Sequence, residues 1–160
     1  MGVDHYCTVR DMNHGIKPKD GPVLVTGASG GVRSIAAMIL ASMGYRVTAS
    51  TGRPEEAAWL YKTVGVEEII NRSELASPGK PLQKERGAAA IDTVGSHTLC
   101  NACAGVRYGS IVAACGMAQG MDLMGKRLVR TVLIFTESSD QLSRATDRVP
   151  GLPASPGYVQ

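Results

Sequence analysis

Short apolar runs alternate along the chain with longer segments whose apolar residues recur at helical spacing. Val23–Val25 is a continuous apolar run, which is typical of a strand buried on both faces of a parallel sheet. Ser34–Met43 follows after a glycine-rich turn and is apolar on almost every side, which predicts a buried helix that ends at Gly44. The pattern therefore begins with a strand, a tight turn and a helix.

The same alternation continues toward residue 115. Further strands are expected at 46–50, 68–71, 88–94 and 110–115, and further helices at 54–64 and 97–106. Residues 73–85 predict a turn of helix and a loop, and Leu128–Phe135 could form a sixth strand. Regular alternation of this kind predicts an α/β fold, a doubly wound parallel sheet of five to six strands.

The alternation of apolar runs covers only the middle of the chain, which divides the sequence into three segments. Residues 1–20 are polar and show no clear period, so we expect a flexible N-terminal arm with one turn of helix at most. Residues 21–136 form the expected domain, and a chain of 160 residues has room for one. Residues 137–160 are rich in Ser, Asp, Arg, Pro and Gly, which predicts a disordered tail.

Composition narrows the class of protein. Hydrophobic residues make up 44% and charged residues 19%, as in a globular protein. The net charge of +3 comes from scattered basic residues, and a single Trp and a single Phe offer no base-stacking platform, so a nucleic-acid partner is not expected. No apolar run approaches the ~20 residues of a membrane span, and residues 1–20 lack an apolar signal core. We therefore expect a cytoplasmic protein without a membrane partner.

The four cysteines indicate no metal site. Cys100 and Cys103 form a C-x-x-C motif within a predicted helix, with no second pair and no His at zinc spacing. We expect them to be buried free thiols.

The strongest chemical motif lies in the turn after the first predicted strand. Residues 23–33 read VLVTGASGGVR and stand between a buried strand and an apolar helix, the context that a dinucleotide-binding fingerprint requires. Gly27 or Ala28 provides the tight turn, and Gly30 and Gly31 let the backbone approach a diphosphate. The start of the following helix directs free N–H groups and a partial positive charge at that diphosphate.

Arg33 departs from the fingerprint. Its position normally holds a small residue, which allows the first helix to lie close to the strand. We expect the Arg33 side chain to point outward or to push the helix away, giving a distorted turn and weaker cofactor binding. A contact between its guanidinium and a phosphate is the alternative.

The end of the second predicted strand selects the type of dinucleotide. An NAD site usually has an acidic residue there for the ribose hydroxyls, about 20 residues further on. This chain has Ser50-Thr-Gly-Arg53 instead. Arg53 can bind a 2′-phosphate in a bidentate manner, and Ser50 or Thr51 can donate to it, so the sequence favours NADP(H) over NAD.

Three rival motifs fit less well. The glycine turn lacks the Gly-Lys pair of a P-loop, and the tyrosines at 45, 61 and 108 lack the Lys four residues later that a short-chain dehydrogenase requires. Gly27–Gly31 matches the G-x-S-x-G elbow of a serine hydrolase by letters. The candidate partners Asp92 and His97 are only five residues apart, however, and Ser29 follows the first strand of the sheet.

Six segments of the chain together resemble one known family. They are Gly21–Gly31, Ala49–Glu55, Glu68–Arg72, Gly79–Arg86, Ile91–Gly95 and Val112–Gly116. From about His14 to Asp122 the chain is similar to the Rossmann-type cofactor domain of the zinc-free medium-chain dehydrogenase/reductases, in the branch of acryloyl-CoA reductase and quinone oxidoreductase.

The resemblance implies a cofactor and a set of binding residues. It implies NADPH-dependent reduction of an activated C=C bond, with acryloyl-CoA converted to propionyl-CoA, or reduction of a quinone. We assign no catalytic residue within this chain. The implied contacts are with the pyrophosphate for Ser29, Gly30, Gly31 and Val32, with the 2′-phosphate for Thr51 and Arg53, and with the nicotinamide for Thr93, Val94, Gly95, Cys115 and Gly116.

Family members also carry a GroES-like N-terminal domain that holds most of the substrate and proton-transfer groups. Residues 1–13 do not resemble it, so we expect it to be missing here. The first hypothesis is an oxidoreductase of this family with NADPH and an acyl-CoA or quinone as partners. We also expect that the protein can form a homodimer, because Leu128–Phe135 could form an exposed edge strand. The alternative is a non-catalytic NADP-binding module or a degenerate fragment without turnover.

Overall fold

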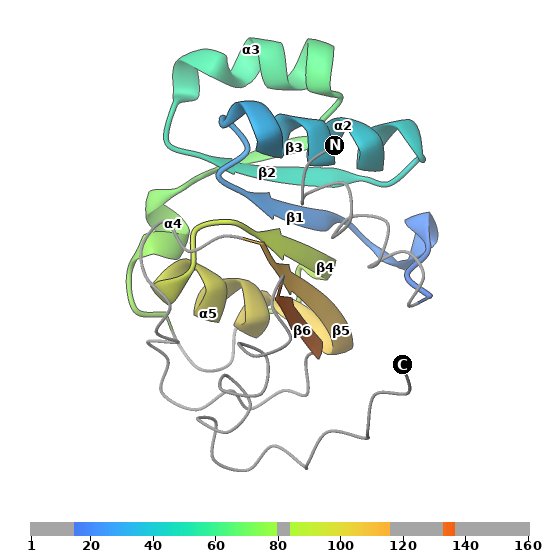
Figure 1. Cartoon of the computed structure of the whole chain (residues 1–160), viewed down its shortest axis with the longest axis vertical. Helices are drawn as coiled ribbons and strands as arrows, with labels where there is room; N and C mark the ends of the chain where they lie inside the picture. Colours follow the sequence, from blue (N-terminus) through green and yellow to red (C-terminus); the bar gives the residue numbers. More distant parts are fainter. Residues whose placement is uncertain (1–14, 80–83, 116–132, 137–160) are drawn as a thin grey trace.

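The computed structural model describes residues 15–79, 84–115 and 133–136. Six parallel strands form one sheet in this part of the chain, in the order β3-β2-β1-β4-β5-β6 (Figure 1). The chain direction across the sheet reverses between β1 and β4, and folds of this order bind ligands in the crevice outside the carboxyl ends of the strands at that point. The prediction of a doubly wound parallel sheet is confirmed.

The strands and helices follow the alternation that the sequence predicts. The strands are β1 Val23–Thr26, β2 Val47–Thr51, β3 Glu68–Asn71, β4 Gly87–Asp92, β5 Val106–Ala114 and β6 Leu133–Thr136. The helical segments are the 3₁₀ turn η1 Pro18–Asp20, α2 Gly31–Ser42, the 3₁₀ turn η2 Pro54–Glu56, α3 Ala57–Trp59, the π-helical turn η3 Leu60–Val64, α4 Ser73–Ala76 and α5 Ser96–Gly105.

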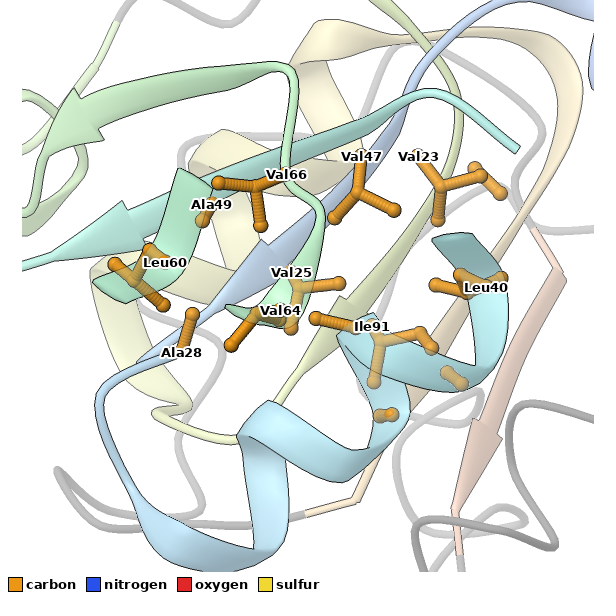
Figure 2. Packing of buried hydrophobic residues seen from close by; sticks show 14 residues of the cluster. Val23, Val25, Ala28, Leu40, Val47, Ala49, Leu60, Val64, Val66 and Ile91 are labelled. Atoms are coloured by element: carbon orange, nitrogen blue, oxygen red, sulfur yellow. The ribbon is translucent and has the colours of Figure 1, made fainter. Parts of the chain in front are cut away.

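Alternate residues of the buried strands face two different hydrophobic cores. Val23 and Val25 of β1 face the larger core, which α2 and η3 cover (Figure 2). Leu24, between them, packs into the smaller core together with Leu99 of α5. Because successive strand residues point to opposite faces, the continuous apolar run that predicted this strand is what a sheet covered on both sides requires.

Two elements begin three or more residues before the expected position, whereas the other bounds up to residue 115 differ from the expected ones by at most two residues. Helix α2 begins at Gly31 rather than Ser34, since the N–H groups of Arg33 and Ser34 both donate to the Gly30 carbonyl, at 2.9 and 3.0 Å. Strand β5 begins at Val106 rather than Ser110, because the buried Val106 already pairs with β4, with a register shift before the regular ladder. The glycine turn therefore leads straight into the helix.

The second predicted helix is divided into η2, α3 and η3. Pro54 begins it as expected, and Gly65 ends it in a left-handed conformation. Near its end the N–H groups of Gly65 and Val66 both donate to the Leu60 carbonyl, at 3.0 and 3.2 Å. The wide final turn keeps Leu60 and Val64 buried in the larger core.

The described start of the chain is attached to the domain. The Tyr45 hydroxyl donates to the Ile16 carbonyl at 2.6 Å, and Ile16 packs against the larger core. The rest of the predicted arm, Gly116, and the predicted tail lie outside the described residues. None of the helices in the described part combines the length and the apolarity that crossing a lipid bilayer demands.

Candidate dinucleotide-binding site

The glycine turn connects the carboxyl end of β1 to the first turn of α2. Gly27 has a φ of +65°, which favours a residue without a side chain, and the Gly30 N–H closes the turn on the Gly27 carbonyl at 3.1 Å. Gly31 and Val32 are the first residues of α2, and N–H groups at that position have no acceptor within their own helix. The free backbone donors of the turn are thus those at the start of α2, and we call the segment Gly27–Val32 the diphosphate cradle.

Ala28 and Ser29 have different places in the cradle. The Ala28 side chain is fully buried in the larger core, and its N–H donates to the Ser50 carbonyl at 3.2 Å. Ala28 can therefore affect ligand binding only through the shape of the turn. The Ser29 hydroxyl is hydrogen-bonded to the Thr51 hydroxyl, which fastens the cradle to the end of β2.

The Arg33 side chain lies over the cradle. A Cβ atom built on Gly30 would lie 3.1 Å from Arg33 Cδ, and one built on Gly27 would lie 3.0 Å from Arg33 Nη1. The side chain is half-buried, and α2 starts with regular hydrogen bonds beneath it. The expectation that Arg33 points outward or pushes the helix away is therefore wrong, since the side chain folds back onto the glycines.

A buried carboxylate organises the loop after β4. Asp92 is fully buried and accepts from Thr26 Oγ1 and from the Gly95 N–H, both at 2.7 Å. The Thr93 N–H in turn donates to Thr26 Oγ1 at 3.1 Å. Burial raises the pKa of Asp92, while the hydrogen bonds and the positive charge of Arg33 lower it. The network holds the loop after β4 against the end of β1, on one side of the crevice.

The residues expected to line a nicotinamide lie at the ends of β4 and β5. Thr93, Val94 and Gly95 are buried in the loop between β4 and α5. The Cys115 N–H, just beyond β5, donates to the Asp92 carbonyl at 2.7 Å. The structure therefore brings these four predicted residues together.

The end of β2 presents a second group of predicted residues. Ser50 and Thr51 are buried, and Thr51 Oγ1 accepts the Arg53 N–H at 3.0 Å. The Arg53 guanidinium is exposed and forms an ion pair with Glu56, with 2.9 Å between Nη1 and Oε1. That hydrogen bond is the main cause that raises the pKa of Arg53. Thr51 thus links the cradle to the backbone of Arg53.

Arg72 is a site residue that sequence reasoning missed. A Cβ atom built on Gly52 would lie 3.0 Å from Arg72 Nε, so this guanidinium covers Gly52. The Arg72 N–H donates to the Thr51 carbonyl at 2.9 Å. The expected order of the strands could have identified Arg72. Because β3 pairs with β2 in parallel, the residue after β3 lies beside the residues after β2. Two arginines therefore lie near Gly52.

The other candidate chemistries find little support in the described residues. Those residues contain no group of three His, Cys, Asp or Glu side chains placed to hold a metal ion. Cys100 and Cys103 are free thiols, as predicted, but only Cys103 is fully buried, whereas Cys100 is half-buried. Burial raises the pKa of both thiols. The Ser29 hydroxyl bonds to Thr51 rather than to a His, which argues against a hydrolase elbow.

A Rossmann-type dinucleotide-binding domain is defined by three features together: the strand order, the cradle at the β1–β4 reversal, and Arg53 and Arg72 at the ends of β2 and β3. No protein-family model matches the chain. The chain is 46% identical over 112 residues to the acrylyl-CoA reductase AcuI of Ruegeria pomeroyi. The matched residues make up 69% of this chain and 34% of that protein.

Two solved structures have the same fold at higher coverage of this chain. The YhdH oxidoreductase from Salmonella enterica in complex with NADP has a TM-score of 0.78 and 36% identity, over 92% of this chain and 49% of that one. The YhfP protein of Bacillus subtilis with NAD bound has a TM-score of 0.75 and 31% identity, over 92% of this chain and 48% of that one. The chain thus spans about a third of the length of its curated relative and about half of the solved chains.

The chain represents the cofactor-binding domain of the medium-chain dehydrogenase/reductase superfamily, in the acryloyl-CoA reductase and quinone oxidoreductase branch. The resemblance found in the sequence is therefore confirmed.

Proposed function

We propose that this chain binds NADPH along the carboxyl edge of its sheet and serves as the cofactor domain of an NADPH-dependent oxidoreductase. The reaction is reduction of an activated C=C bond, with acryloyl-CoA converted to propionyl-CoA. Reduction of a quinone is the second candidate, because one relative at 41% identity carries a quinone oxidoreductase name. When bound, NADPH supplies the hydride.

The observation that carries the proposal is the cradle at the start of α2. Gly30 adopts φ −84° and ψ 140°, which any residue can adopt, so its lack of a side chain serves space rather than conformation. In this fold that space allows the backbone to approach a diphosphate. The α2 N-terminus adds a partial positive charge to which a diphosphate is attracted.

Two arginines support NADPH over NADH. Arg53 and Arg72 lie at the ends of β2 and β3, where the 2′-position of the adenosine ribose is expected in this fold. No carboxylate stands at the end of β2 in the segment Ser50–Arg53. Guanidinium groups recognise phosphate through paired hydrogen bonds. The ion pair with Glu56 leaves Arg53 exposed and able to exchange partners.

A titration of the full chain with NADPH and NADH tests binding. We expect saturable binding that is tighter for NADPH. A Gly30→Ala variant should bind NADPH at least tenfold more weakly, because its methyl group enters the space that the diphosphate needs. Gly105→Ala is the matched control, since a Cβ atom there meets nothing within 4 Å. No NADPH binding by the wild type, or equal binding by Gly30→Ala, refutes the proposal.

Turnover separates an enzyme domain from a non-catalytic NADP-binding module. NADPH oxidation is followed with acryloyl-CoA and with a quinone as acceptors. Hydride transfer needs close alignment of the reactants and exclusion of water. NADPH binding without oxidation by either acceptor is the result expected of the non-catalytic module.

A homodimer is the remaining part of the proposal. Among the described strands, β6 stands at one edge of the sheet and pairs with β5 alone. Edge strands offer unpaired backbone groups to a second copy. We expect a dimer in sedimentation experiments on the full chain, and a monomer at all concentrations would exclude it.

A further inference from the structure

The space that Gly30 leaves open is filled by another side chain of the same chain. Around the position that a Gly30 Cβ atom would take, Arg33 Cδ lies at 3.1 Å, Nη1 at 3.5 Å and Nε at 3.6 Å. This is the space through which a diphosphate approaches the backbone in folds of this type. The cradle therefore has the right backbone and is covered by an arginine.

The guanidinium also lies close to Gly27. Its Nη1 atom lies 3.0 Å from the position of a Gly27 Cβ atom, and Thr93 Oγ1 lies 3.1 Å from that same position. The side chain thus extends from the first turn of α2 toward the loop after β4. A diphosphate and the Arg33 side chain cannot occupy this volume together.

Two electrostatic effects act on the Arg33 side chain in this position. The guanidinium lies at the positive end of the α2 dipole, which disfavours a cation. The buried Asp92 carboxylate is close enough for the Arg33 charge to act on it. That carboxylate already accepts bonds from Thr26 and Gly95. The position of the Arg33 side chain is therefore opposed by the helix dipole and favoured by the charge of Asp92.

We propose that Arg33 competes with the diphosphate for the cradle and so determines which nucleotides the site binds well, an inference that rests on the proposed function. Nucleotides that bridge through a diphosphate must displace the side chain. Ligands that use only the 2′-phosphoadenosine end, beside Arg53 and Arg72, do not. If the cradle is covered in about nine molecules of ten, apparent affinity for the bridged nucleotide falls about tenfold.

The test compares two ligands on four proteins. The ligands are NADPH and adenosine 2′-monophosphate, which lacks the diphosphate. The proteins are the wild type, Arg33→Ala, Arg33→Gly and Arg46→Ala. Arg46 is exposed and precedes β2 at the opposite edge of the sheet, so its variant removes the same charge away from the site. Arg33→Ala keeps the helix propensity that Arg33→Gly loses, which guards against a folding defect.

If Arg33 blocks the cradle, its removal strengthens NADPH binding, whereas if Arg33 attracts NADPH by its charge, its removal weakens NADPH binding. We expect both Arg33 variants to bind NADPH about tenfold more tightly, with adenosine 2′-monophosphate changed less than twofold. Loss of a positive charge alone would weaken NADPH binding in the Arg33 variants and slightly in Arg46→Ala. Unchanged or weaker NADPH binding by both Arg33 variants, beside a binding wild type, overturns the inference and leaves the proposed function standing.

A second measurement reports the side chain directly. In the nucleotide-free protein, an NMR cross-relaxation contact between the Arg33 Hδ and Gly30 Hα protons is expected, and it should disappear when NADPH saturates the site. Absence of that contact in the free protein overturns the inference. Absence of NADPH binding by every variant refutes the proposed function and the inference with it.

Discussion

Replacing Thr26 by Val tests whether the buried Asp92 network holds the site together. Val is close in shape to Thr, yet the exchange removes a hydroxyl and is not conservative in a polar site. Thr26 is fully buried, and its hydroxyl donates to Asp92 Oδ1 at 2.7 Å and accepts the Thr93 N–H at 3.1 Å. One substitution therefore removes two buried hydrogen bonds.

The size of the effect follows from these two bonds. A hydrogen bond to a charged group contributes about 1.5–3 kcal/mol, and a buried N–H left without an acceptor costs about 1–3 kcal/mol. The added methyl group recovers roughly 1 kcal/mol through apolar burial. We expect the free energy of unfolding to fall by about 3 kcal/mol, which for a domain of this size lowers the Tm by roughly 6–12 °C.

The assay is urea unfolding followed by circular dichroism, together with a titration of NADPH. Thr48→Val is the matched control, because Thr48 stands on the neighbouring strand β2 and its hydroxyl donates to the carboxylate of the exposed Glu68 at 3.1 Å. We expect a loss below about 1 kcal/mol for that control. NADPH binding should weaken in Thr26→Val alone, since Thr93 adjoins the crevice. Equal losses of stability in the two variants would show that the Asp92 network has no special role.

Two further predictions concern charge. Arg53→Ala and Arg72→Ala should each weaken NADPH binding about tenfold and NADH binding less than twofold, since each guanidinium is expected to contact only the 2′-phosphate; equal loss for both dinucleotides in a calorimetric titration would contradict this. For Asp92, burial raises the pKa above the ordinary value of 3.8. Between that value and the raised one the folded state binds more protons than the unfolded state, so stability falls as the pH rises. Asp92→Asn should remove this slope from urea unfolding measured at increasing pH, and an unchanged slope would assign it to another group.

The sequence predicted the larger part of the fold from local pattern. Apolar runs such as Val23–Val25 identified the strands, because only strands covered on both faces lack polar alternation. Glu68–Asn71 was predicted with its observed bounds. The glycine turn and the segment from Ser50 to Arg53 predicted a dinucleotide-binding site because their chemistry depends on backbone shape and on residue types close in sequence.

Tertiary structure decided what these residues touch. Arg72 lies beside Gly52 only because β3 pairs with β2. Asp92 receives the Thr26 hydroxyl only because β1 and β4 are neighbours at the reversal of the sheet. The Arg33 side chain lies over Gly27 and Gly30, which its residue type alone did not predict. Sequence determined the elements and the class of site, whereas contacts between residues far apart in the chain, such as Thr26 with Asp92 and Arg72 with Gly52, decided how the parts of that site are held together, because no local pattern encodes them.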